Sequence, residues 1–398
     1  MYTLDTEGHI TTPAGFLAGA VAAGVKYDNR LDLAVITSDR ACSAAGVFTR
    51  NAIRSAPVLV SSRRIADGRA RAVIANSGCA NACTGSRGVE DAQKMTTLLA
   101  TRLGIDTSEV LVASTGVVGT YIPLDRIERG IQDLELSPAN GHLFARAIMT
   151  TDTRPKEVAA TIDDARGRYS IGAAAKGSGM IHPNMGTLLA FITTDATVEP
   201  GYLKRTLSAA VDGTLNMVTV DGDTSPSDTT IILANGASGV PPITEKNGDE
   251  FARALYCVCE HLAQQIAADG EGATRLLKVI VTGAESVADA RLAARTIASS
   301  PLVKSAINGA DPNWGRIACA AGRSGAAVDA DKIAITLNRV QVMKAGMPML
   351  FNEQRLRSSL EGREVTVEVS LGVGGCTAIA WGCDLSQDYV TINASYTT

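Results

Sequence analysis

The sequence contains 398 residues, of which 45% are hydrophobic, 20% charged and 4% aromatic. A formal net charge of −4 and a pI near 5.7 provide no basic surface of the kind that binds nucleic acid or an anionic membrane. The length is enough for two domains of ordinary size.

The N-terminus has neither the basic nor the apolar region of a signal peptide, so we expect a cytoplasmic protein. The eight cysteines do not form paired C-x-x-C sites, and the four histidines are scattered without an H-E-x-x-H motif. We therefore expect buried free thiols and no metal site.

The first third of the chain alternates apolar segments with a helical pattern. Strand candidates lie at 33–37, 44–48, 55–60 and 71–75, and residues 88–103 carry apolar side chains at helical spacing. This order of strand, loop and helix predicts a mixed α/β fold.

A further strand within 110–119 stops at Thr115 and Gly116. A hydroxyl and a backbone N–H at a strand end can be aimed at one point, as in an oxyanion hole. The alternative is an ordinary strand-to-turn transition. Further along, Thr153 and Lys156 have the spacing of a nucleophile–lysine pair, a pattern that often arises by chance.

The segment from Gly177 to Thr194 has no charged residue, but glycines, Pro183 and Asn184 interrupt it. It is too interrupted for a membrane span. We interpret it as a buried, irregular loop leading into a strand that begins near Thr187. Because a buried loop must satisfy its backbone polar groups, a functional role is expected.

Within this loop, Gly186 and Thr187 can support self-cleavage. Glycine leaves its carbonyl open to attack, and the Thr187 hydroxyl lies one residue beyond it. An N-to-O acyl shift and hydrolysis would leave Thr187 as a new N-terminus, with nucleophile and base in one residue. The alternative is a simple loop-to-strand junction, with threonine favoured for its β propensity.

The C-terminal half continues the mixed α/β pattern. Helices are predicted around 203–211, 251–266 and 286–299, and strands at 278–282 and 364–370. The acidic run 221–228 lacks EF-hand spacing and is interpreted as a hydrogen-bonded turn. Residues 389–398 are strand formers and predict a docked terminus.

The segment 176–196, KGSGMIHPNMGTLLAFITTDA, resembles the self-cleavage segment of the ornithine acetyltransferase family, the arginine-biosynthesis bifunctional glutamate N-acetyltransferases. Members usually have alanine where this chain has Gly186, and small or acidic residues are common at the position of His182. The resemblance extends from residues 22–26 to the last residue. It implies an αββα-layered, N-terminal-nucleophile-like fold and an α2β2 heterotetramer of cleaved chains 1–186 and 187–398.

The resemblance also implies roles for individual residues. Thr187 would be the nucleophile, Gly186 and Thr187 the cleavage site, and Thr115 and Gly116 the oxyanion hole. Residues implied to bind substrate, besides Thr187 itself, are Thr153, Lys176, Glu271, Asn393 and Thr398. The Glu271 carboxylate suits the ammonium of ornithine.

The implied reaction is ping-pong transfer of acetyl from N-acetylornithine to glutamate through an acetyl-Thr187 ester. No cofactor is expected, although acetyl-CoA is a possible co-substrate. Two alternatives remain open: an amide hydrolase or aminopeptidase with the same kind of nucleophile, and a binding protein that has lost processing. Glutamate-dependent turnover would separate the transferase from the hydrolase, and an uncut, inactive chain would indicate the binding protein.

Overall fold

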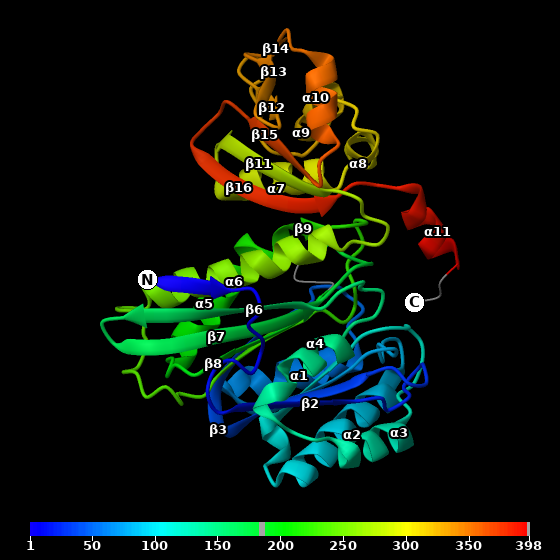
Figure 1. The fold of residues 1–398 in the computed structure, drawn as a ribbon, viewed down its shortest axis with the longest axis vertical. Coiled ribbons are helices and arrows are strands. Elements are labelled where there is room, and N and C mark those ends of the chain that lie inside the picture. Colours follow the sequence, from blue (N-terminus) through cyan, green and yellow to red (C-terminus); the bar gives the residue numbers. More distant parts are fainter. Residues whose placement is uncertain (183–187, 396–398) are drawn as a thin grey trace.

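The computed structural model describes residues 1–182 and 188–395, which fold around two β-sheets (Figure 1). The predicted mixed α/β class is confirmed. Gly186, Thr187 and Thr398, three of the predicted site residues, lie outside the described residues.

Within the described residues the first sheet has nine strands, in the order β1-β6-β7-β8-β10-β3-β4-β5, with β2 pairing with β3. Their bounds are β1 (Tyr2–Asp5), β2 (Phe16–Val21), β3 (Leu33–Phe48), β4 (Arg69–Asn76), β5 (Val110–Ser114), β6 (Lys156–Asp164), β7 (Gly167–Lys176), β8 (Leu189–Thr194) and β10 (Thr229–Ala234). β8 lies between β7, to which it is antiparallel, and β10, to which it is parallel. The two strand candidates at 33–37 and 44–48 are parts of one long strand, β3, whose pairing with β4 shifts register between Thr37 and Cys42.

Helices cover both faces of this sheet. One face carries α1 (Ala56–Arg64), α2 (Gly85–Leu103), α3 (Leu124–Asp133), α5 (Pro200–Gly213) and α6 (Asp249–Ala268), and α4 (Gly141–Ala147) packs on the other. In α2 the apolar spacing noted in the sequence places Ala92, Met95 and Leu99 in the core at 0% exposure. Short 3-10 helices are η1 (Ile65–Asp67), η2 (Thr107–Glu109), η3 (Pro138–Asn140) and η4 (Leu215–Met217).

The second sheet has seven strands among the residues described, in the order β14-β13-β12-β15-β11-β16-β9. Its bounds are β9 (Val218–Thr219), β11 (Leu276–Ala284), β12 (Ala334–Leu337), β13 (Val340–Lys344), β14 (Met347–Pro348), β15 (Glu364–Ser370) and β16 (Cys376–Cys383), with α7 (Val287–Ala298), α8 (Pro301–Asn308), α9 (Trp314–Gly322) and α10 (Glu353–Leu360) around it. α6 lies between the two sheets (Figure 1) and contacts strands of both. One continuous apolar core joins the two sheets through it.

Three expectations from the sequence are wrong. Residues 55–60, expected as a strand, form the start of α1, where Pro57 is tolerated because the first helical turn needs no N–H donor there. The strand formers of the terminal segment form a helix instead, α11 (Gln387–Ser395), which has no buried residue but contacts Glu271 through Asn393. Cys83 and Cys319 are exposed rather than buried, although all eight cysteines are free. Among the described residues, none of the helices combines the length and apolar character needed to cross a bilayer.

Candidate active site

A pocket lies where loops following strands of the first sheet meet the loop after α6 and the helix α11. It encloses about 1010 Å³, including space open to solvent. Its lining residues come from eight segments of the chain, within 26–32, 77–80, 115–118, 149–151, 176–180 and 221–227, together with Glu271 and the α11 residues Tyr389 and Asn393.

Gly116 lines this pocket at a position that requires glycine. Its φ is +130°, and a Cβ there would lie 2.7 Å from the backbone nitrogen of Cys79. The neighbouring N–H groups of Thr115 and Val117 donate to the carbonyls of Asn76 and Gly78. The Gly116 N–H has no acceptor within the described residues, so it remains available to a ligand.

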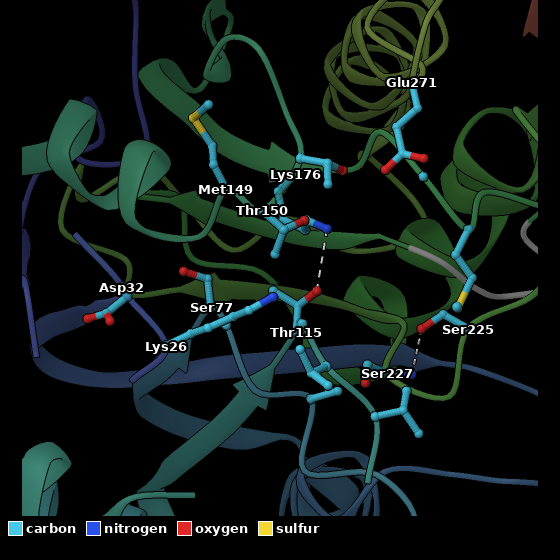
Figure 2. Close-up of a pocket in the computed structure, with 18 of the residues that line it drawn as sticks. Lys26, Asp32, Ser77, Thr115, Met149, Thr150, Lys176, Ser225, Ser227 and Glu271 are labelled. Atoms are coloured by element: carbon cyan, nitrogen blue, oxygen red, sulfur yellow. Dashed lines mark hydrogen bonds between the residues drawn. The ribbon is translucent and has the colours of Figure 1, made fainter. Parts of the chain in front are cut away.

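Thr115 presents its hydroxyl beside this N–H, and Lys176 donates to it. The Lys176 Nζ lies 3.4 Å from Thr115 Oγ1 (Figure 2). Because the hydroxyl accepts from the ammonium, its own proton can be donated to a bound oxyanion. Burial lowers the pKa of Lys176, and the nearby Lys156 lowers it further.

A buried network of charges lies under the pocket. Lys156 is fully buried and its Nζ lies 2.7 Å from Asp152 Oδ1 and 2.5 Å from Asp269 Oδ2. Burial alone would raise the pKa of Asp152, but Lys176 and Lys156 together hold it well below its usual range. Asp152 also accepts from the N–H groups of Thr150 and Gly177, and thus connects two of the pocket loops.

Glu271 supplies a carboxylate to the opposite side of the pocket from Lys26 (Figure 2). Asn393 of α11 donates to Glu271 Oε2 at 2.9 Å, and the backbone N–H of Glu271 donates to the Ser178 carbonyl. Gly179 faces the same carboxylate, and a side chain there would overlap it. Glu271 is 6% exposed, so its charge is held in place rather than solvated.

Asp221 tethers the chain just before the undescribed segment. Its carboxylate accepts from the N–H groups of Met180 and Ile181 at 2.6 and 2.9 Å, and from its neighbour Asp223. Met180 has a φ of +55°, which is uncommon for a side chain of its size. The acidic run 221–228 is thus a hydrogen-bonded turn that also lines the pocket.

Comparisons with known proteins show the family to which this chain belongs. The ArgJ family matches over residues 17–398. The chain belongs to the ArgJ family. The "Arginine biosynthesis bifunctional protein ArgJ" of Dehalococcoides mccartyi is 49% identical over 396 residues, covering 98% of both chains, and that of Staphylococcus aureus is 44% identical, covering all of this chain and 97% of the relative.

A solved ArgJ structure from Bacillus halodurans shares 45% identity, with a TM-score of 0.51. This match spans 52% of the present chain but 98% of the solved one. The family match over residues 17–398 agrees with the resemblance seen in the sequence, which runs from residues 22–26 to the last residue.

The structure brings together most of the predicted site residues that it describes. Thr115, Gly116, Lys176, Glu271 and Asn393 all line the one pocket. Thr153 is not among the lining residues: its N–H and its hydroxyl both donate to Asp269, so it supports the loop that carries Glu271. The described residues contain no group of three or more His, Cys, Asp or Glu side chains placed to hold a metal ion.

Several functional candidates were missed from the sequence. Lys26, Ser77 and Tyr389 line the pocket, and Lys156 and Asp269 form its charged base. The sequence signal for Asp269 was its place beside Glu271 in one glycine-flanked loop. Lys26 carried no local pattern, because its place in the pocket depends on contact with residues distant in the chain, such as Gly78.

Proposed function

We propose that this protein transfers the acetyl group of N-acetylornithine to glutamate in arginine biosynthesis. The observation that carries the proposal is the pocket itself. It combines an available Gly116 N–H, a Thr115 hydroxyl polarised by Lys176 and the Glu271 carboxylate. An acetylated amino acid with a cationic side chain matches these groups, and the ArgJ relatives are named for arginine biosynthesis.

The proposal includes self-cleavage between Gly186 and Thr187. Leu189, at the start of β8, pairs with Lys176 on one side and Thr229 on the other, so the chain enters β8 next to pocket-lining residues. Residues 187–398 make up slightly more than half of the sequence. The solved ArgJ chain matches 52% of this chain over 98% of its own length. This is the coverage expected when the solved chain is one of the two products of cleavage.

In the acetyl-transfer step, the Thr187 hydroxyl attacks the acetyl carbonyl and passes its proton to the Thr187 amine. Gly116 and Thr115 donate hydrogen bonds to the oxyanion. A donor of this kind stabilises the transition state by about 3–4 kcal/mol. The C–N bond then breaks as the Thr187 amine passes the proton to the nitrogen of the leaving group. Ornithine departs, and an acetyl-Thr187 ester remains. The amino group of glutamate attacks this ester, and N-acetylglutamate departs as Thr187 regains its proton.

The remaining parts of the proposal follow from the family resemblance. We expect an α2β2 assembly of the two cleaved chains in the cytoplasm, with no resident cofactor. We also expect acetyl-CoA to acetylate Thr187, releasing the free thiol, because relatives are named bifunctional and both donors would yield the same ester. Incubating the enzyme with labelled acetyl-CoA and glutamate tests this: labelled N-acetylglutamate is expected, and its absence would leave acetylornithine as the donor.

The first test is the intact mass of the purified protein with N-terminal sequencing. We expect two chains, one starting at Thr187. Labelled N-acetylornithine without acceptor should then add one acetyl group to that chain, and Thr187→Ala should remain uncut and unlabelled. If the rate of ornithine release does not depend on glutamate and free acetate is formed, the protein is a hydrolase. An uncut, inactive wild-type chain would overturn the proposal.

A further inference from the structure

The pocket is divided by charge. Lys26 and Lys176 provide positive charge beside Thr115, whereas Glu271 lies on the far side of Lys176 from Lys26 (Figure 2). In this view the Lys26 side chain extends toward Thr115. Thr115 therefore lies between Lys26, with Asp32 beyond it, and Glu271 on the other side of one cavity (Figure 2).

The fold holds Lys26 in this position through its backbone. Asp32 accepts from the N–H groups of Ala23 and Val25 at 2.7 and 2.6 Å, which fixes the loop that ends at Lys26. The Lys26 Cβ then packs on Gly78, where an added Cβ would lie 2.8 Å away. Gly78 in turn contacts Gly116, so three backbones in contact set the place of Lys26 relative to the oxyanion hole.

Other cations near the pocket are less suited to receive a ligand. Lys176 is only 5% exposed, donates to Thr115 and lies close to Asp152. Arg30 donates to the carbonyls of Met149 and Thr150 at 2.9 and 2.7 Å. Lys26 is more exposed within the pocket than Lys176, and its ammonium lies over the Tyr27 ring, 4.9 Å from Nζ to the ring centroid.

The chemistry of an acetylated amino acid determines which group such a lysine would meet. Only the amide nitrogen and Cα separate the acetyl carbonyl from the α-carboxylate. A carbonyl oxygen bound at Gly116 therefore keeps the α-carboxylate within a few bonds of the oxyanion hole, and the side chain is free to extend toward Glu271. Donor and acceptor share the α-carboxylate but have side chains of opposite charge.

We infer that Lys26 binds the α-carboxylate of the amino-acid substrate and so sets the orientation that both half-reactions need. This inference rests on the proposed acetyl transfer. It makes Lys26 a specificity-determining residue for an α-carboxylate, distinct from Glu271, which selects the side chain. A charge-assisted hydrogen bond of this kind corresponds to about 10- to 100-fold in affinity.

The test compares N-acetylornithine with its α-carboxamide, which is neutral but nearly the same in shape, as donors to glutamate. Wild-type enzyme should prefer the carboxylate by about 10- to 100-fold in kcat/KM. Lys26→Met, which keeps the stem on Gly78 but removes the ammonium, should lose most of this preference by lowering kcat/KM for the carboxylate substrate alone. Lys26→Arg should retain part of the carboxylate preference. Lys94→Met, which removes one positive charge from an exposed position on α2, should show the same preference as wild type.

The outcomes separate the two levels of the argument. Wild-type enzyme that does not transfer acetyl at all would overturn the proposed function. Active wild-type enzyme with a Lys26→Met variant that keeps the full preference, or loses both substrates equally, would overturn the role of Lys26. If Lys26→Met does not fold or cleave itself, the charge-preserving Lys26→Arg decides: it must retain a carboxylate preference, and a preference abolished in that variant would contradict the inference.

Discussion

At the scale of single residues, Gly116 has no room for a side chain. Gly116→Ala adds a Cβ that would meet the backbone of Cys79 at 2.7 Å and forces an L-residue to a φ of +130°. We expect kcat for acetyl transfer to fall by about 10²–10³-fold because the N–H donor moves. The matched control is Gly119→Ala, where φ is +82° but nothing lies within 4 Å. Equal losses in the two variants would point to general backbone strain instead.

The buried charges give a prediction about stability. Lys156→Met leaves Asp152 and Asp269 together in the interior without their shared cation. We expect a loss of about 3–5 kcal/mol in the free energy of unfolding. Urea titration should be done on uncut Thr187→Ala proteins, so that each variant is a single chain. The double variant Lys156→Met/Asp269→Asn should recover part of the loss, and a Lys156→Met protein as stable as its parent would contradict the assignment.

At the scale of elements, α11 serves the pocket more than the fold. It has no buried residue, but Asn393 donates to Glu271. Removing residues 387–398 should therefore change the thermal midpoint little and raise the KM for N-acetylornithine by about 10-fold or more. Asn393→Ala should show a part of the same effect. A truncated protein that unfolds many degrees earlier would show instead that the helix supports the core.

The elements also show how far sequence reasoning extends. Periodic apolar side chains correctly predicted α2, α6 and β15, because burial of one face leaves a regular pattern. Residues 55–60 and 389–395 have strand-forming composition but form helices, because strand propensity is weak and depends on context. The position of α6 in contact with both sheets has no local signal. The motif residues of the site were identifiable by resemblance, whereas Lys26 and the partners of Lys156 needed contacts between distant segments.

At the scale of the whole molecule, His182 lies near Arg295 of α7, a helix that packs on the second sheet. Burial, with a smaller contribution from Arg295 on α7, lowers the pKa of His182 to about 4. An unfolded histidine titrates near 6.5. Between these values the unfolded chain binds a proton that the folded chain does not, so stability rises with pH across this window and is fully present above about 6.5.

His182→Asn should therefore reduce the pH dependence of the unfolding free energy between about pH 4 and 6.5, with little change in slope above pH 7. Unfolding the variant and its parent in urea at four or five pH values measures the effect. Glu157→Gln, at a carboxyl whose pKa is raised by burial and which bonds His142 elsewhere in the fold, is a useful comparison. If the unfolding free energies of His182→Asn and its parent change with pH in parallel, the proposed titration of His182 is wrong.

The position of β8 has a consequence for how the molecule can be assembled. β8 belongs to the segment after Thr187, yet its neighbours are β7, from before that point, and β10, which in turn pairs with β3. A cut before Thr187 would leave two polypeptides that share one sheet, with β8 and β10 of one polypeptide lying between β7 and β3 of the other. Folding would then change from a first-order to a second-order reaction, and the melting temperature would depend on protein concentration. The precursor would be the form that refolds readily from dilute solution, whereas the mature protein, once unfolded, would need its two chains to find each other again.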